Sequence, residues 1–171
     1  MHVDLDEHLS DKTGADRASG GRHPLPSRET VAQRLSTLGL RQDMQVVVMD
    51  RQGANYCGRL WWMLKWCGHE AVAVLDGGLA AWQAAGGSLD IGPAAPHALG
   101  DFALKPALTG TSTAAQIASR LGDPSLTLID ARAAARFRGE VEPLDPVAGH
   151  IPGALNRPFA DNLGPDGRFK P

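Results

Sequence analysis

The sequence predicts an α/β fold with parallel strands and flanking helices. Two observations carry this prediction: short apolar, β-branched runs at 45–49 and 71–75, and a helical segment over about 57–67 that separates them. A buried strand, a helix and a second buried strand in that order are typical of a parallel sheet. A further apolar strand at 126–129, which leads into Asp130, predicts a second sheet region.

The helices of the first half have recognisable ends. Ser27 is a favourable N-cap for a helix over about 28–38, and Gly39 stands where a C-cap is expected. The helix over 57–67 stops at Gly68. Before it, a seven-residue loop runs from Asp50 to Tyr56.

The rest of the chain is less regular. A Gly-rich turn at 76–78 leads into a short helix over 79–85, and the Gly- and Pro-containing stretch 86–110 predicts a linker. A helix is predicted over about 113–121, before the strand at 126–129, and the tail 158–171 is predicted to be a loop.

The composition is that of an ordinary globular protein of 171 residues, with 43% hydrophobic and 21% charged residues. The formal net charge of −2 shows no basic excess, so neither nucleic acid nor an anionic membrane surface is an expected partner. Apolar stretches are far shorter than the ~20 residues of a membrane span. Because residues 1–30 show no leader-like pattern, a cytoplasmic location is expected.

Five segments together resemble the tandem-domain rhodanese family, the thiosulfate and 3-mercaptopyruvate sulfurtransferases. One is the strand that leads to Asp130 with the arginine-bearing turn after it. The others are listed here: Gly149-His150-Ile151-Pro152-Gly153-Ala154, Leu75-Asp76-Gly77-Gly78-Leu79-Ala80-Ala81-Trp82, and the helix Arg59–Trp66 with the loop His23–Pro26. The resemblance implies a rhodanese-like parallel sheet with flanking helices.

The resemblance also implies two partial repeats. A weak internal similarity aligns His2–Leu9 with Asn156–Leu163, which in the family follow the same His-Ile-Pro-Gly landmark. We therefore interpret 1–85 as the C-terminal part of a first, non-catalytic repeat and 86–110 as the linker. Residues 111–171 are interpreted as the N-terminal part of a second, catalytic-type repeat that lacks its cysteine loop. The nucleophilic cysteine is expected beyond Pro171.

Family chemistry is persulfide transfer by a low-pKa cysteine at the end of a strand, cradled by backbone N–H groups. In the first repeat that position is Asp50, which cannot form a persulfide, so a loop-capping role is favoured. Cys57 lies where a helix N-terminus would lower its pKa, but a buried, inert thiol is the preferred interpretation. Cys67 is interpreted as core filler, and the spacing of the two cysteines does not indicate a metal site.

Arginines and a His–carboxylate pair are the candidate site residues that the resemblance marks. Arg136 matches the arginine that holds the substrate's anionic end, and Arg138 is a second substrate-binding candidate. The alternative is that they pair with nearby Asp130, Glu140 or Glu142. Asp6 and His23 resemble polar residues that a first domain lends to the active site.

Two further residues are given supporting or structural roles. Asp130, at the carboxyl end of a strand, is interpreted as an organising carboxylate. His150 is expected to fix a turn.

The implied function is a sulfurtransferase that moves sulfane sulfur from thiosulfate or 3-mercaptopyruvate to a thiol or cyanide acceptor. No cofactor or metal is expected. We expect the chain alone to be inactive, and the alternative is a non-catalytic rhodanese-like binding or regulatory module. Two incomplete repeats would either close into one sheet or expose apolar edges that favour self-association.

Overall fold

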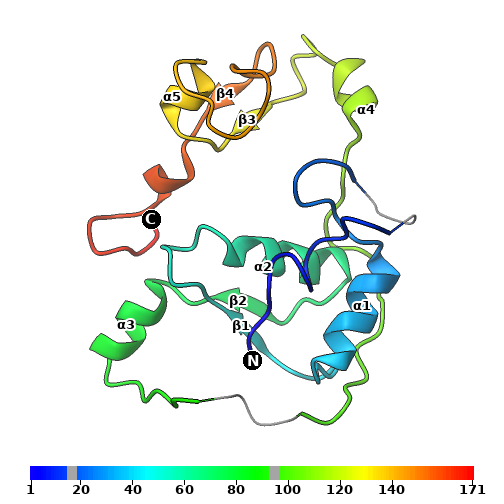
Figure 1. The fold of residues 1–171 in the computed structure, drawn as a ribbon, viewed down its shortest axis with the longest axis vertical. Helices are drawn as coiled ribbons and strands as arrows, with labels where there is room; N and C mark the ends of the chain where they lie inside the picture. The colour runs from blue at the N-terminus through cyan, green and yellow to red at the C-terminus, as the bar shows by residue number, and fades with distance from the viewer. Residues whose placement is uncertain (15–18, 93–96) are drawn as a thin grey trace. The chain divides into compact units, whose positions relative to one another are not determined.

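The computed structural model describes residues 1–14, 19–92 and 97–171. The chain divides into two compact units, Met1–Thr111 and Ser112–Pro171, and each holds one pair of parallel strands (Figure 1). The α/β class with parallel strands and flanking helices, predicted from the sequence, is confirmed. Among the described residues no helix is long and apolar enough to cross a membrane.

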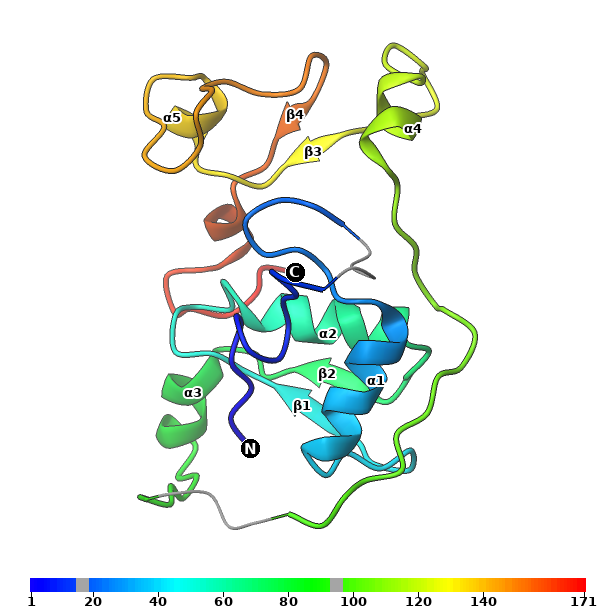
Figure 2. The ribbon, with the colours of Figure 1, turned by 45° about the vertical axis from the view of Figure 1, so that its right-hand side comes forward.

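The first unit is a β-α-β arrangement. Strand β1 (Val46–Val48) pairs in parallel with β2 (Val72–Val74), and helix α2 (Cys57–Trp66) connects them and lies along one face of the pair (Figure 2). Successive strand side chains point to opposite faces, so Val48 is buried while Val47 is 56% exposed. The two strands and α2 therefore occur where the apolar pattern places them.

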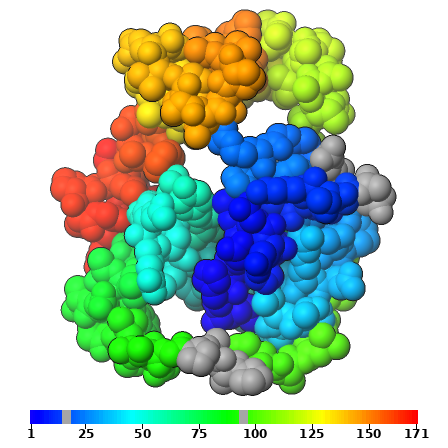
Figure 3. Space-filling view, in the orientation of Figure 1, coloured from blue at the N-terminus to red at the C-terminus, as the bar shows by residue number. Residues whose placement is uncertain are grey.

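The hydrophobic core of the first unit lies between α1 (Arg28–Thr37), α2 and the strand pair. Ser27 caps α1 by accepting the N–H of Thr30 at 3.2 Å, as its position in the sequence predicts. Val31 and Leu35 lie on the apolar face of α1, which is directed into the core. There they belong to the same buried cluster as Met63 and Leu64 of α2. In Figure 3 the N-terminal segment, dark blue, lies against the light-blue region of α1.

Part of the stretch that the sequence marks as a linker packs on this core. We call residues 97–108 the strap; of the stretch 86–110, residues 93–96 lie outside the described part. The side chain of Phe102 is only 6% exposed, and its N–H donates to the carbonyl of Leu40 at 3.2 Å. Further along, Lys105 N–H donates to the carbonyl of Cys67 at 3.0 Å. The strap thus satisfies carbonyls near the ends of both helices.

Two glycines at these helix ends allow the strap to approach. Gly39 and Gly68 have φ of 84° and 85°, a left-handed conformation that favours glycine. A Cβ at Gly39 would lie 2.8 Å from the Cβ of His97, and one at Gly68 would lie 2.6 Å from the Cβ of Lys105. The glycines that end the helices in the sequence therefore also make room for the strap.

The second unit is small and has no buried residue; the structure describes all of 112–171. Helix α4 (Ala114–Ala118) precedes strand β3 (Ile129–Asp130), which pairs in parallel with β4 (Leu155–Asn156). Between the strands lie α5 (Ala134–Phe137) and a long loop. In the first unit, helix α3 (Gly78–Ala84) follows β2, one residue earlier than the predicted 79–85.

Three expectations for the second unit need correction. The helix predicted over 113–121 ends at Ala118, and the strand predicted at 126–129 is only Ile129–Asp130. A capping box between Thr113 and Gln116 supports the first turn of α4, but no core is present to stabilise more turns. The tail is not only loop, because it contains a 3-10 helix (Phe159–Asn162) and a bridge between Leu163 and Phe169.

Truncating Phe102 to alanine is expected to lower the free energy of unfolding of the first unit by about 3–5 kcal/mol, because a buried aromatic leaves a cavity. The measurement is urea denaturation followed by tryptophan fluorescence. Leu99→Ala is the matched control, since Leu99 lies in the same strap but is 75% exposed, and its cost should stay within about 0.5 kcal/mol. Equal costs for the two variants would show that the strap is not part of the core.

Candidate functional site

The loop between β1 and α2 converges on the carboxylate of Asp50. One oxygen, Oδ1, accepts the backbone N–H groups of Gln52 at 2.7 Å and Ala54 at 3.0 Å. The other, Oδ2, accepts those of Tyr56 at 2.7 Å and Cys57 at 2.8 Å. Asp50 therefore has the loop-capping role that the sequence favours.

The backbone of this loop turns through the left-handed region twice. Gly53 has φ of 67° and Ala54 has φ of 61°, and Ala54 is the only non-glycine residue with positive φ in the described part of the chain. A side chain pays a steric cost there. The loop thus adopts a costly conformation and directs its N–H groups to one point, as anion-binding nests do.

These contacts decide the ionisation of Asp50. Burial opposes ionisation, but the hydrogen bonds from the N–H groups of Cys57, Tyr56 and Gln52 outweigh it and lower the pKa of the carboxyl group. Asp50 is consequently an anion at neutral pH. The cradle of amides is already occupied by a charge that belongs to the protein.

Neither cysteine has the properties of a nucleophile. Burial, followed by the negative charge of Asp50, raises the pKa of Cys57 to about 11, although Cys57 is the first residue of α2. A lowered pKa from the helix N-terminus is therefore not found. Burial also raises the pKa of Cys67 to about 11. Both thiols are buried, which agrees with the inert roles preferred from the sequence.

In the first unit the structure brings together Asp6 and His23. Nδ1 of His23 lies 3.1 Å from Oδ1 of Asp6, and the same oxygen is 2.9 Å from the ammonium of Lys12. The hydrogen bond from Lys12 is the main cause that lowers the pKa of Asp6. Because Asp6 and Lys12 are about half exposed and His23 is one third exposed, the contacts are weak and open to exchange with water or a ligand.

Sequence reasoning missed Arg59, which holds the segments carrying this pair. Its guanidinium donates from Nη2 to the carbonyls of Leu9 at 2.7 Å and His23 at 3.0 Å. Burial lowers the pKa of Arg59, so the carbonyl partners compensate a partly desolvated cation. The signal available in the sequence was a charged residue in the first turn of a mostly apolar helix.

In the second unit Arg136 is paired with carboxylates. Its Nη2 donates to Oε1 of Glu142 at 2.8 Å and to Asp145 at 3.0 Å, and its Nε donates to Oε2 of Glu142 at 3.1 Å. Arg132 also reaches Glu142, at 3.4 Å. Of the three carboxylates that the sequence offers as partners of Arg136, Glu142 is the one used.

Arg138 makes a separate, exposed pair with Glu140, with distances of 2.6 and 2.9 Å. Asp130, at the end of β3, accepts the N–H and guanidinium of Arg132, and these hydrogen bonds lower its pKa. This arrangement agrees with an organising role for Asp130. His150 lies with its Nδ1 2.6 Å from the carbonyl of Phe137 and stacks on that ring, which fits a turn-fixing role.

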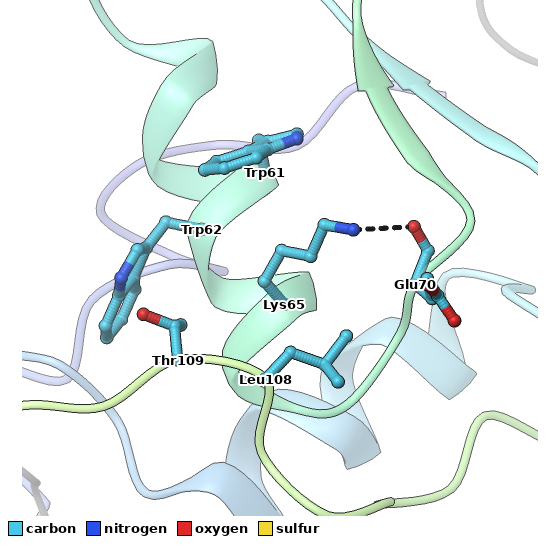
Figure 4. A pocket seen from close by; sticks show the side chains of 6 residues that line it. All are labelled: Trp61, Trp62, Lys65, Glu70, Leu108 and Thr109. Carbon is cyan, nitrogen blue, oxygen red and sulfur yellow. Dashed lines mark hydrogen bonds between the residues drawn. The ribbon is translucent and has the colours of Figure 1, made fainter.

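A shallow surface pocket of about 400 Å³ lies elsewhere on the first unit (Figure 4). Trp61, Trp62 and Lys65 of α2 form one side, and Leu108 and Thr109 form another. The ammonium of Lys65 donates to the carbonyl of Glu70 at 2.8 Å. None of the site residues predicted from the sequence lines this pocket. Among the described residues no cluster of His, Cys, Asp or Glu could hold a metal ion.

Comparisons with known proteins point to one family. A family profile described as a rhodanese-like domain matches residues 5–85. A probable 3-mercaptopyruvate sulfurtransferase of Pseudomonas aeruginosa is 53% identical over 170 residues, which is 99% of this chain and 59% of that protein. The chain is therefore similar to rhodanese-family proteins along nearly its whole length. The resemblance inferred from the sequence is thereby confirmed.

Other proteins of the rhodanese family also match nearly the whole chain. A putative thiosulfate sulfurtransferase of Mycobacterium tuberculosis is 43% identical over 169 residues, 99% of this chain and 58% of that protein. The crystal structure of SseA from Escherichia coli, a 3-mercaptopyruvate sulfotransferase with the rhodanese fold, matches with a TM-score of 0.78 at 34% identity. The match covers 99% of this chain and 61% of that one. The chain thus spans about three fifths of the length of these relatives.

Asp50→Asn is expected to destabilise the first unit by about 1–3 kcal/mol at neutral pH, because the neutral amide leaves loop N–H groups poorly paired. The folded-state pKa of Asp50 is lowered, so the stabilisation is complete above the ordinary pKa and is lost as pH falls through the folded value. The difference in unfolding free energy from the unmodified chain should shrink below about pH 4. The exposed Asp43→Asn serves as the control; a pH-independent difference would contradict the assignment.

Both thiols are expected to resist alkylation in the folded chain. With pKa values of about 11, roughly one thiol in several thousand is ionised at pH 7.5. Iodoacetamide labelling followed by peptide mass mapping should be slow at Cys57 and Cys67 in buffer and fast in urea. Native labelling of Cys57 at the rate seen in urea would refute the buried, protonated thiol.

Proposed function

We propose that this chain is part of a sulfurtransferase that moves sulfane sulfur from thiosulfate or 3-mercaptopyruvate to a thiol or cyanide acceptor through a cysteine persulfide. The observation that carries the proposal is the similarity to named sulfurtransferases along nearly the whole chain, 53% identical in one case. Fold similarity to a solved member supports the same assignment.

The geometry around Asp50 supports this chemistry independently. A carboxylate oxygen stands two bonds from Cβ, as would the outer sulfur of a cysteine persulfide at the same position. Four backbone N–H groups donate hydrogen bonds to the Asp50 oxygens, and the same four groups could stabilise the negative charge of such a sulfur. In this proposal Asp50 is an internal substitute for the persulfide, and the first unit keeps the cradle without the reaction.

The chain by itself is proposed to be inactive, because neither Cys57 nor Cys67 is placed to act as the nucleophile. Arg136, with Arg138 as the second candidate, is proposed to hold the anionic end of the donor. The exposed Asp6–His23 pair is proposed to assist proton transfer at the leaving group. The division into 1–85, 86–110 and 111–171 and a cytoplasmic location stay predictions.

A second candidate is a non-catalytic rhodanese-like binding or regulatory module. The observation that favours it is the filled cradle, since Asp50 excludes both a nucleophile and an external anion there. Self-association belongs to this proposal as well. Apolar strand residues are exposed in both units, namely Val47 at 56%, Ile129 at 65% and Leu155 at 61%.

The decisive experiment places a thiol in the cradle. Asp50→Cys is made together with Cys57→Ser, so that Cys57, whose N–H contacts the side chain at position 50, cannot form a disulfide with the new thiol. The introduced thiolate attacks the outer sulfur of thiosulfate, which releases sulfite and leaves a persulfide. Intact-mass and peptide analysis should show one added sulfur atom at position 50, removable by dithiothreitol.

The matched control is Cys57→Ser alone, which should gain no sulfur. If the thiol at position 50 also gains none while the variant remains folded by circular dichroism, the cradle is not a sulfur-transfer site and the binding-module alternative is favoured. Sulfur found on Cys67 would contradict the inert role of that thiol.

A further inference from the structure

Three consecutive carbonyl oxygens of the N-terminal segment accept hydrogen bonds from two arginines. Arg34 of α1 donates from Nη1 to the carbonyls of His8 at 3.2 Å and Ser10 at 2.8 Å. Arg59 of α2 donates to the carbonyl of Leu9 from Nε at 3.2 Å and from Nη2 at 2.7 Å. Leu9 and Ser10 are also buried. This segment is therefore fixed both by its carbonyl groups and by its contact with the core.

Arg59 joins this segment to a second one. Its Nη2 also donates to the carbonyl of His23 at 3.0 Å, so that a single nitrogen bridges Leu9 and His23. A backbone hydrogen bond from Asp11 to the carbonyl of Pro24, at 3.0 Å, runs between the same two segments. Arg59 thus holds the backbone of His23 against a segment that is anchored in the core.

The contact between Asp6 and His23 determines which ring nitrogen of a neutral His23 carries the proton. The hydrogen bond from Lys12 lowers the pKa of Asp6, so that this side chain is ionised at neutral pH and only accepts hydrogen bonds. Nδ1 of His23, 3.1 Å from Oδ1 of Asp6, must then be the protonated nitrogen. Nε2 is left as an acceptor, and it makes no hydrogen bond within the residues that the structure describes.

We propose that Arg59 is a positioning residue, which holds the His23 backbone where the ring can donate from Nδ1 to Asp6 and present Nε2 as a proton acceptor. This inference rests on the proposed function, in which the Asp6–His23 pair assists proton transfer. Arg59 acts through the carbonyl of His23, and its hydrogen bonds go to carbonyl oxygens rather than to either side chain of the pair.

The physical reason is that the pair cannot hold its own geometry. The side chains of Asp6 and His23 are 55% and 33% exposed, and Lys12 shares the same carboxylate oxygen. Such an exposed pair contributes little free energy, because water screens it and competes for its hydrogen bonds. Hydrogen bonds from the partly buried guanidinium of Arg59 to carbonyl oxygens are stronger, since one partner is charged and the surroundings are less polar. The anchored backbone therefore sets the position of the ring.

The test identifies the protonated ring nitrogen of His23 in the 171-residue chain by two-dimensional ¹H–¹⁵N NMR of the imidazole groups. Spectra are recorded at about pH 8.5, where an ordinary imidazole is neutral. The signals of His23 are assigned by their loss in His23→Gln. His8 is an internal reference, because its Nδ1 accepts the N–H of Asp4 at 2.9 Å and its proton must lie on Nε2. The unmodified chain should show Nδ1–H at His23 and Nε2–H at His8.

Arg59→Met keeps a long apolar side chain but has no donor, and it should lose the Nδ1–H form of His23 as the major species. Arg59→Lys, which returns a charged donor near the place of Nη2, should restore that form. Arg34→Met is the matched control: it removes the same kind of hydrogen bond from the N-terminal segment and should leave His23 unchanged. Asp6→Ala removes the acceptor and gives the reference spectrum of an unpaired ring.

An Nδ1–H form of His23 that persists in Arg59→Met overturns the role of Arg59 and leaves the proton-transfer role of the pair intact. An equal loss in Arg34→Met, or a loss that Arg59→Lys does not reverse, also overturns it, because the effect would then be a general loosening of the segment. His23 found as Nε2–H in the unmodified chain overturns both this inference and the role of the pair.

The sulfur-loading experiment at position 50 is unaffected by any of these results, so the proposed sulfur transfer is tested separately. Circular dichroism and urea denaturation check that each variant is folded. If Arg59→Met does not fold, Arg59→Gln takes its place, because its neutral side chain ends well short of the position of Nη2.

Discussion

The first unit depends on the carboxylate of Asp50. Helix α2 begins at Cys57 without a capping side chain from its N-cap residue, Tyr56. The N–H groups at its start would be unpaired, and Asp50 accepts two of them from across the loop. The same side chain holds the left-handed turn at Gly53 and Ala54. One charge therefore fixes where the main core helix starts and how the loop before it is shaped.

The second unit is stabilised differently. It has no buried apolar residue, and its best-connected side chains are charged: Arg132 joins Asp130 to Glu142, and Glu142 joins Arg136. Exposed ion pairs contribute little individually, but Glu142 is enclosed, so its interactions resist solvent screening. The chemistry proposed for Arg136 and the integrity of this unit thus rely on the same few contacts, which limits how freely the arginine can be engaged.

The elements that the sequence predicts well are those with a strong local pattern. The strands near 45–49 and 71–75 and the helices capped by Ser27 or ended by Gly68 are found, because β-branched runs, caps and glycines act locally. The short strands of the second unit are not, since two-residue strands leave no periodicity. The burial of Phe102 could not be predicted from its Gly- and Pro-containing stretch either. It depends on contact with Leu40, which lies far away in the sequence.

The site was predictable to the extent that it rests on residue types. An aspartate at the strand end implies that its side chain occupies the loop. Which backbone N–H groups donate to it can be known only from the path of the backbone. Spacing alone left Arg136 with three possible carboxylate partners, and only the course of the loop after Gly139 selects Glu142. Arg59 bonds to carbonyl oxygens, which every residue carries, so no sequence pattern could identify its partners.

The strap limits where the first unit can be joined to a segment from another protein. Similarity to the rhodanese profile ends at residue 85, whereas the compact first unit continues to Thr111. A chimera joined at the profile boundary would carry a foreign segment over Gly39 and Gly68, and that segment would need an aromatic residue at the right register to fill the space of Phe102. Exchange of this module therefore keeps the native packing when the crossover point lies beyond the strap, and otherwise depends on an aromatic residue in the foreign segment.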